Sequence, residues 1–286
     1  MEDVQNHPDA RNIALDHAGV SDLRYPIVVL DRDHQVQHTV ANISMSVGLP
    51  EEFKGTHMSR FIEVLNMHRG EMTMRTLPML LHDLRQRLHA KTARVEVVFP
   101  YFIERVAPVS GAKALMDYEC SFIGESLNGE DDFVLGVKVP VTSLCPCSKA
   151  ISDYGAHNQR GHIAIQTRGA RQPDGGTAFV WIEELVGIAE RAASAPVYPL
   201  LKRPDERHVT MQAYDNPVFV EDMVREAALS LQRDSRVAWF HIRAVNQESI
   251  HNHSAFAQIE WSRKNLATTA VLTDSAVAAS AEEMVA

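Results

Sequence analysis

Residues 133–149 read FVLGVKVPVTSLCPCSK, and this stretch is the clearest indication of the fold. Apolar side chains recur at every second position from Phe133 to Val141, which predicts a β-strand with one buried face. The strand runs directly into Cys145-Pro146-Cys147-Ser148-Lys149, a polar segment with an irregular backbone. We therefore expect a strand near the middle of the chain that delivers chemically useful side chains at its end.

The order of elements around this strand occurs twice. Further strands are predicted at 36–47, 93–106, 113–124, 161–168, 236–246 and 254–261. Helices are predicted at 77–88, 182–193 and 216–232, the last capped by Asn216, and after Ser59 as a further cap. Strands, helices and strands in that order, twice over, favour an α+β protein made of two antiparallel modules. This is not the βαβ alternation of a Rossmann fold, and the sequence has no Gly-rich phosphate loop.

These patterns divide the chain into four parts. We predict an N-terminal tail at 1–22, a first module at 23–128, a second module at 129–265 and a C-terminal tail at 266–286. The second module carries most of the chemically distinctive motifs. The last segment is rich in Ala, Ser, Thr and Glu and has little to bury, so we expect it to be disordered or a loose helix.

Composition excludes several classes of function. With 286 residues and a formal charge of −9, the chain lacks the positive footprint that broad nucleic-acid binding needs. An anionic small-molecule substrate is compatible with this charge where Lys and Arg gather locally. No apolar run is long enough to span a membrane, and residues 1–19 contain no signal-peptide core. Three cysteines form no visible disulfide framework, so we expect a protein of the reducing cytoplasm without membrane or nucleic-acid partners.

Cys145 and Cys147 are the leading candidates for chemistry. Residues i and i+2 of an extended segment project to the same side, so both sulfur atoms can face one small volume. His157 follows in the polar loop Gly155-Ala156-His157-Asn158-Gln159-Arg160. A thiolate and an imidazole are good ligands for a divalent metal, and the second thiol would serve proton transfer, so a catalytic metal site is the leading hypothesis. The alternative is that the cysteines are small buried hydrophobes and that His157 is an ordinary surface residue.

Acidic and histidine residues further along the chain are weaker candidates. Glu206 lies within a short charged run that is typical of a solvated surface. Glu221 is near the start of a predicted helix, where a carboxylate also interacts favourably with the helix dipole. Glu248, His251 and His253 fall within six residues between two predicted strands, in a loop that is either a simple turn or part of a site.

Five strings of residues carry a resemblance to a known family. They are Thr142-Ser143-Leu144-Cys145-Pro146-Cys147-Ser148-Lys149, the Gly155–Arg160 loop, Arg203-Pro204-Asp205-Glu206, Asn216-Pro217 with Phe219-Val220-Glu221-Asp222, and Glu248-Ser249-Ile250-His251-Asn252-His253. Taken in order, they resemble the type IB GTP cyclohydrolases of bacteria, densely over 130–262 and also over 23–127. The resemblance implies the tunnelling fold (T-fold), with two tandem ββααββ antiparallel modules in one subunit and subunits that assemble into barrels.

The resemblance also implies an activity and a cofactor. The reaction would be hydrolysis of GTP to 7,8-dihydroneopterin triphosphate and formate, the first step of pterin and folate biosynthesis. Cys145, His157 and Glu206 correspond to the family's metal ligands, and three ligands leave a position for an activated water. The family uses Zn²⁺, Mn²⁺ or Fe²⁺, and this mixed ligand set does not choose among them. Active sites at subunit contacts imply a homo-oligomer, with a tetramer expected.

The remaining motif residues take roles from the same resemblance. Cys147 and His251 correspond to groups that move protons during ring opening and loss of formate, and Glu248 to a group that holds or tunes His251. Glu221 matches the carboxylate that anchors the purine by accepting hydrogen bonds from the guanine N–H and amino groups. The expected triphosphate partners are Lys149 and Arg160.

Three other interpretations compete with this one. A nitrile reductase of the same fold would use a single activated cysteine and NADPH without a metal. A related cyclohydrolase would release a cyclic phosphate product from the same substrate. A structural zinc protein or metal chaperone would use Cys145, Cys147 and His157, and it would unfold when the metal is chelated.

Overall fold

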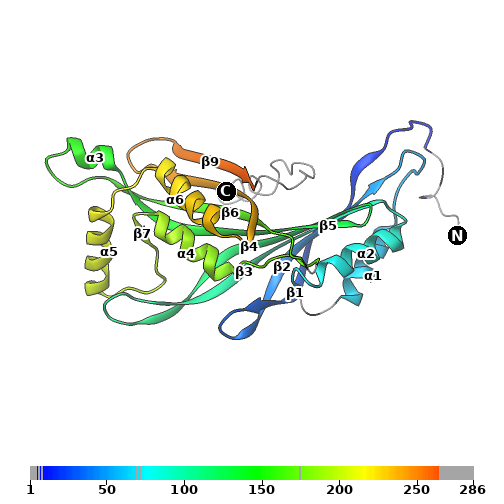
Figure 1. The fold of residues 1–286 in the computed structure, drawn as a ribbon, viewed down its shortest axis with the longest axis horizontal. Coiled ribbons are helices and arrows are strands. Elements are labelled where there is room, and N and C mark those ends of the chain that lie inside the picture. The colour runs from blue at the N-terminus through cyan, green and yellow to red at the C-terminus, as the bar shows by residue number, and fades with distance from the viewer. Residues whose placement is uncertain are drawn as a thin grey trace.

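The computed structural model describes residues 5, 7, 9–68, 70, 72–173 and 175–263. Within these residues nine strands form one sheet, and every strand pair in it is antiparallel. The path through the sheet is β1-β2-β3-β4-β5-β6-β8-β9, with the short β7 paired to β5, so the sheet is one long meander (Figure 1). The predicted α+β class is confirmed.

The first half of the chain contains two strands, two helices and two strands. They are β1 (Leu15–Asp31), β2 (Gln35–Leu49), α1 (Met58–Met67), α2 (Leu77–Leu88), β3 (Thr92–Val106) and β4 (Lys113–Leu127). The elements of the second half repeat this order, with two further helices and a two-residue strand among them. They are β5 (Glu130–Leu144), α3 (Pro146–Ile151), β6 (Asn158–Gly169), α4 (Ile182–Ala192), β7 (Ala195–Pro196), α5 (Arg203–Asp215), α6 (Val220–Arg233), β8 (Val237–Gln247) and β9 (Ser254–Ser262). No helix in the described ranges is long and apolar enough to cross a membrane.

Helices cover one face of the sheet. Helix α2 packs on β3 and β4, α4 packs on β5, and α6 packs on β8 and β9 (Figure 1). Alternating residues of the strands are buried beneath them, as Val137, Val139 and Val141 of β5 show. The apolar alternation at 133–141 that predicted this strand is therefore the core-facing side of the sheet. The other side of each strand faces away from the helices, and we call it the open face.

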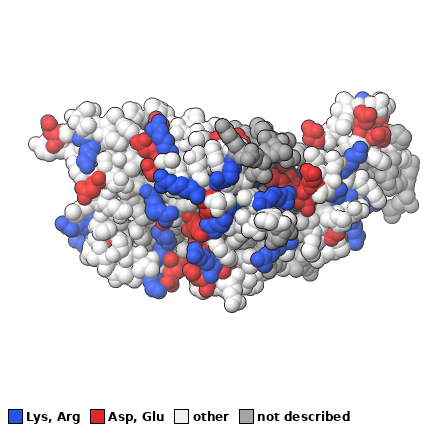
Figure 2. All heavy atoms as spheres, viewed as in Figure 1, with Lys and Arg blue, Asp and Glu red and all other residues white. Residues whose placement is uncertain are grey.

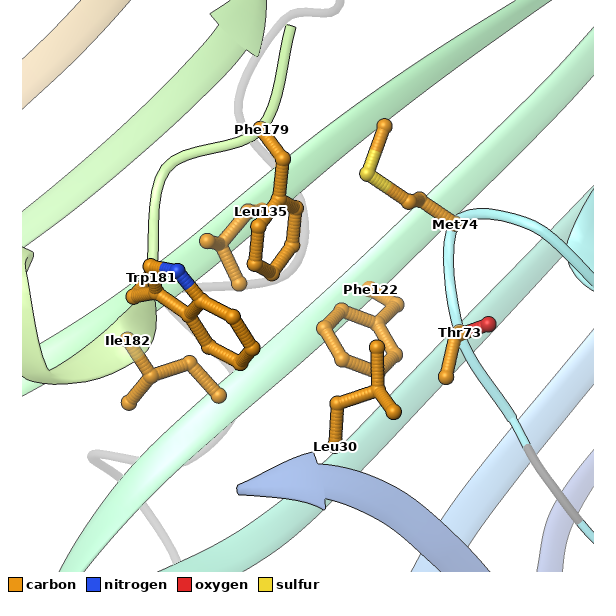
Figure 3. A pocket seen from close by; sticks show the side chains of 8 residues that line it. All are labelled: Leu30, Thr73, Met74, Phe122, Leu135, Phe179, Trp181 and Ile182. Carbon is orange, nitrogen blue, oxygen red and sulfur yellow. The ribbon is translucent and has the colours of Figure 1, made fainter. Parts of the chain in front are cut away.

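The two halves share one hydrophobic core. The division predicted between residues 128 and 129 falls in the turn that joins β4 to β5, and these two strands pair with each other. A small apolar cavity of about 10 Å³ lies where the halves meet (Figure 3). Its wall is formed by Leu30, Thr73, Met74, Phe122, Leu135, Phe179, Trp181 and Ile182. Because both halves contribute to this wall, they are packed together as one body.

On the face seen in Figure 2, acidic and basic side chains are interspersed.

The predicted N-terminal tail at 1–22 is wrong over residues 15–22, because β1 begins at Leu15 and pairs with β2. The first part of this strand is largely exposed, and its register shifts between Leu15 and Ala18 and again between Val20 and Leu23. An exposed strand with two irregularities shows no regular alternation, which is why the pattern missed it. The predicted C-terminal tail at 266–286 lies outside the described residues.

Two predicted helix caps are also wrong. Helix α1 starts at Met58, so Ser59 lies inside it, and α6 starts at Val220 with Phe219 as the residue before it. Asn216 instead uses its side-chain amide to donate to the carbonyls of Ala193 and Ser194 at 3.0 and 3.3 Å. Asn216 therefore follows the end of α5 as its C-cap and does not start α6.

Candidate active site

Four of the predicted site residues meet at one end of the sheet. Cys145 follows the last residue of β5, His157 precedes β6, and Glu248 follows β8. The register pairs Leu144 with Asn158 and Gly161 with Asn246, so these three strand ends are neighbours. The loop between β8 and β9 adds His251, whose ring centroid lies 6.5 Å from that of His157. The sheet register therefore gathers residues that are about a hundred positions apart in the sequence.

The Cys145 segment is tied to the His157 segment through backbone and hydroxyl contacts. The Cys145 amide donates to the carbonyl of His157 at 3.1 Å, and the His157 amide donates to Ser148 Oγ at 3.2 Å. Cys145 is the residue before α3, and its Sγ accepts from the Ser148 amide at 3.4 Å. The short helix α3, which begins at Pro146, thus holds the sulfur at its own N-terminal end. Cys147 lies on this helix and is exposed. The predicted extended segment with both sulfur atoms on one side is therefore wrong, because residues two apart in a helix do not face the same side.

Buried polar side chains orient the imidazole of His157. Its Nδ1 lies 2.8 Å from Gln159 Oε1, and Gln159 in turn donates to Ser143 Oγ at 3.4 Å. Asn246 donates to the same hydroxyl at 3.1 Å. With Nδ1 donating to an amide oxygen, Nε2 keeps its lone pair for a ligand, an arrangement that is usual for metal-binding histidines.

Gln159, Asn246 and Ser143 are residues that the sequence interpretation missed. All three are buried. They occupy core-facing positions of β6, β8 and β5, where the alternating pattern calls for apolar side chains. A polar residue at such a position was the signal that could have found them, because buried polar groups need a partner.

Glu248 and the two loop histidines form a titratable group beside His157. Glu248 Oε2 lies 3.9 Å from His157 Nδ1, and the side chains of Glu248 and His157 are 14% and 11% exposed. The rings of His251 and His253 are stacked with centroids 5.1 Å apart. This loop is therefore part of the same site and not a simple solvent-exposed turn.

The start of α6 lies next to the Cys145 segment. The Val218 amide donates to the carbonyl of Leu144 at 3.1 Å, and Ser143 Oγ donates to the carbonyl of Val218 at 3.1 Å. Glu221 is in the first turn of α6 and its side chain is exposed. An exposed carboxylate beside the cysteines can therefore accept hydrogen bonds from a ligand.

Glu206 is not brought to this group. Asp205 binds its end of α5 to the turn between β3 and β4, where the amides of Val109 and Ser110 each donate to Asp205 Oδ1 at 2.8 Å. Tyr214, near the other end of α5, accepts a hydrogen bond from Lys149 Nζ at its carbonyl, and its ring contacts the same ammonium group. Eight residues of α-helix separate Glu206 from Tyr214 by about 12 Å. Within the described ranges, no group of three or more His, Cys, Asp and Glu side chains is close enough to hold a metal ion.

The two expected triphosphate partners lie on different sides of the site. Lys149 Nζ donates to the carbonyl of Tyr214 at 2.5 Å and lies 4.2 Å from the centre of that ring. Arg160 is exposed and follows the buried Gln159 on β6, so it lies on the open face. A separate groove of about 650 Å³, bordered by Met74, Asp131 and Trp181, is lined by none of the predicted site residues.

Comparison with known proteins identifies the family. A family model described as "Type I GTP cyclohydrolase folE2" matches residues 1–257. The chain belongs to this family. Among its relatives, the GTP cyclohydrolase FolE2 of Syntrophotalea carbinolica is 53% identical over 261 residues, which cover 91% of this chain and 95% of the relative. The FolE2 of Geotalea uraniireducens is 53% identical over 264 residues, covering 92% and 94%.

The chain also resembles solved structures with very different sequences. The uricase of Arthrobacter globiformis superposes with a TM-score of 0.53 at 11% identity, covering 89% of this chain and 96% of that one. Urate oxidase from Bacillus sp. TB-90 gives 0.52 at 9% identity, covering 87% and 100%. At such low identity these similarities show a shared fold and nothing about chemistry.

Proposed function

We propose that this protein is a GTP cyclohydrolase that converts GTP and water to 7,8-dihydroneopterin triphosphate and formate, the first step of pterin and folate biosynthesis. Membership of the FolE2 family supports the activity. The structural observation that carries the proposal is the meeting of Cys145, His157, Glu248 and His251 at one end of the sheet. These side chains supply a thiol, imidazoles and a carboxylate, the groups that metal binding and proton transfer require.

A divalent ion, Zn²⁺, Mn²⁺ or Fe²⁺, would be held by Cys145, His157 and Glu206. The orientation of His157 supports this, since its Nδ1 is engaged by Gln159 and its Nε2 is left as a ligand. When bound, the ion would lower the pKa of a water molecule and so supply hydroxide for attack on guanine C8. Two of the three ligands lie on neighbouring segments of one chain, and Glu206 lies at the far end of α5.

The position of Glu206 supports an oligomer whose sites are shared between copies. A homo-oligomer, which we take to be a tetramer built from two T-fold modules per chain and closed into barrels, would bring Glu206 of one copy to Cys145 and His157 of another. The similarity to uricase in fold agrees with modules of this type. Both outermost strands, β1 and β9, end the sheet with one unpaired edge in the described chain, which suits pairing between copies.

The proton transfers would be carried out by Cys147 and His251. His251 stacks on His253 and lies beside His157, and its backbone amide donates to the carbonyl of Glu248 at 3.4 Å. We assign to the Glu248 carboxylate, which lies 3.9 Å from His157 Nδ1, the tuning of His251. Cys147 is exposed on α3 and is free to approach a substrate atom. Each can give a proton to, or take one from, the opening imidazole ring or the departing formate.

Glu221 would select guanine. Its exposed carboxylate lies in the first turn of α6, beside the Cys145 segment. A carboxylate accepts two parallel hydrogen bonds from the N–H and amino groups of guanine, whereas adenine presents a different pattern of donors. Lys149 and Arg160 would contact the triphosphate, and Lys149 would have to leave the Tyr214 carbonyl to do so.

The deciding experiment is turnover of GTP by the purified protein with added Mn²⁺, followed by formate release and by pteridine fluorescence after oxidation. Cys145→Ala should lose both bound metal and turnover, whereas Cys147→Ala should retain metal and lose rate. Full turnover by Cys145→Ala would contradict the metal assignment. Chromatography of the product separates the triphosphate from a cyclic phosphate, and the absence of formate release would exclude the reaction altogether.

A further inference from the structure

Three adjacent strands present basic side chains on the open face of the sheet. Lys138 of β5 is paired with Ala164 of β6, and Ala164 is paired with Arg243 of β8. Directly paired residues of antiparallel strands point to the same face. Lys138 and Arg243 therefore stand on either side of the short Ala164 side chain, with their backbones roughly 10 Å apart. The side chain between them is a single methyl group.

The next rows of the sheet continue this arrangement toward the Cys145 end. His162 is paired with Pro140 and with Val245, and Arg160, two residues further, is paired with Thr142. We call Lys138, Arg160, His162 and Arg243 the basic stripe. Along β6 the stripe advances by about 7 Å for every two residues, so that its charges form a track and not a single point.

Among the described residues, Glu119 of β4 is the carboxylate that pairs with this stripe. On the same face of β5, β6 and β8, the described residues from 134 to 142, 160 to 166 and 241 to 247 include no Asp or Glu. Lys138 Nζ lies 3.8 Å from Glu119 Oε1 of β4, whose side chain is 48% exposed, and such a pair contributes little. Arg243 has neutral partners: it donates to Gln258 Oε1 at 2.6 Å, and its guanidinium lies 4.3 Å from the Phe256 ring centre.

The basic stripe affects the pKa of its histidine, His162. Burial lowers the pKa of His162, and the neighbouring charges of Lys138 and Arg243 lower it further, to about 4. His162 is therefore neutral near pH 7, with one ring N–H to donate. Lys138 Nζ lies toward Glu119 of β4 and the Arg243 guanidinium toward Phe256 of β9, so the two charges flank a strip of the open face that a multiply charged anion would span.

We propose that Lys138, His162 and Arg243, with Arg160 at the end nearest Cys145, bind a phosphate chain on the open face of the sheet. Cations spaced along a track fit an anion whose charge is spread over several phosphoryl groups, and Arg and Lys are the usual partners of phosphate oxygens. The site follows from the arrangement of these residues alone. If the ligand is the triphosphate of the substrate, the inference rests on the proposed function. If the ligand is a free phosphate chain, it does not.

The test is calorimetric titration of the full-length protein with tripolyphosphate, added as its magnesium complex so that bound metal is not removed. The double variant Lys138→Ala/Arg243→Ala should bind at least tenfold more weakly than the unaltered protein. The matched control Arg87→Ala/Lys113→Ala removes two exposed, ion-paired cations elsewhere and should bind as the unaltered protein does. Equal binding by all three proteins, equal weakening in both double variants, or no binding by the unaltered protein would overturn the proposal.

Kinetics with GTP then distinguish the two sources of the phosphate chain. If the stripe holds the substrate's triphosphate, tripolyphosphate should compete with GTP, and Lys138→Ala/Arg243→Ala should raise KM at least tenfold. If it holds a separate anion, KM should be unchanged and tripolyphosphate should bind together with GTP. Either result supports the site. If the unaltered protein does not turn over GTP, the proposed activity fails. Weaker tripolyphosphate binding by Lys138→Ala/Arg243→Ala would still support the phosphate site in that case, so the two failures are distinguishable.

Discussion

At the scale of single residues, the side chains that orient His157 are as informative as His157 itself. Gln159 is buried and holds Nδ1, and it is fixed by Ser143, which Asn246 also contacts. The sequence predicted His157 from its polar loop, whereas Gln159 would have been found only by extending the alternation of the strand predicted at 161–168 back to position 159. The pairing of β5, β6 and β8 shows that this position faces the core.

Gln159→Leu should impair the site while leaving the fold intact. The shape of the side chain is kept but the acceptor for His157 Nδ1 is lost, so the imidazole is free to change tautomer and rotate. Loss of such an orienting partner typically costs about 10- to 100-fold in metal affinity or activity. Metal content and kcat/KM measure the effect. Gln166→Leu, at an open-face position of the same strand, is the control and should change neither; an equally active Gln159→Leu would contradict the orienting role.

His162 should make the protein less stable in acid. Its folded-state pKa is about 4, below the ordinary value of 6.5, because of burial and of Lys138 and Arg243. Between these pH values the unfolded chain binds a proton that the folded chain does not, so the free energy of unfolding falls as pH decreases. Solvent screening at this half-buried position reduces the expected contribution to about 2 kcal/mol.

Urea unfolding at pH 7 and pH 4 measures this contribution. His162→Gln, which cannot titrate, should lose about 2 kcal/mol less than the unaltered protein over this interval. The same loss in both proteins would show that His162 is not responsible. His82→Gln, at an exposed position of α2, is the matched control.

At the scale of elements, α5 shows how a charged run can be structural. The run around Glu206 is typical of a solvated surface, yet Asp205 within it is completely buried. Its carboxylate accepts from the Val109 and Ser110 amides, from Ser110 Oγ at 2.6 Å and from the Lys202 amide at 2.8 Å. These hydrogen bonds lower the pKa of Asp205, against the opposing effect of its burial. The contacts join the start of α5 to the turn between β3 and β4.

Asp205→Ala should therefore loosen α5 as a unit. Removing the carboxylate leaves the amides of Val109, Ser110 and Lys202 and the Ser110 hydroxyl without their acceptor. Breaking a hydrogen-bond network around a buried group is among the larger single-residue effects. We expect the melting temperature to fall by roughly 5–10 °C. Asp215→Ala, at the exposed opposite end of the helix, should change it little. Calorimetry measures both, and similar melting temperatures for the two variants would contradict the anchoring role of Asp205.

Elements with strong apolar periodicity were predicted well. The ranges 77–88 and 182–193 correspond to α2 and α4, and the strand at 113–124 corresponds to β4 with shifted ends. Helices α3 and α5 were missed because neither has an apolar stripe of its own. Helix α3 is only six residues long. Helix α5 has only two buried residues, Asp205 and Ala213.

At the scale of the whole molecule, Glu206 lies away from Cys145 within one chain, and this predicts that the two residues meet between copies. If Glu206 acts on the site of another copy, the inactive variants Cys145→Ala and Glu206→Ala should complement each other. Mixed assemblies would contain sites in which both residues are intact, restoring roughly a quarter of full activity in a dimeric arrangement of sites. Unfolding and refolding an equimolar mixture before the assay allows the copies to exchange.

The matched control mixes Cys145→Ala with Cys147→Ala. Both cysteines lie on one continuous segment, so no mixed assembly contains an intact site, and no recovery is expected. Recovery in the first mixture alone supports a shared site. Its absence, with mixed assemblies shown by mass spectrometry, would mean that Glu206 reaches Cys145 within one chain or is not a ligand.

The sequence by itself determined the α+β class, most of the regular elements and the residues worth examining. These follow from local periodicity and from motifs that are contiguous in the chain. The tertiary structure decided which of those residues meet: Cys145, His157, Glu248 and His251 come together, and Glu206 does not. It also decided that Asp205 is buried and that Lys138 and Arg243 flank Ala164. The physical reason is that strand register and helix placement are set by packing across the whole sheet, and no local pattern encodes a distance between residues remote in sequence.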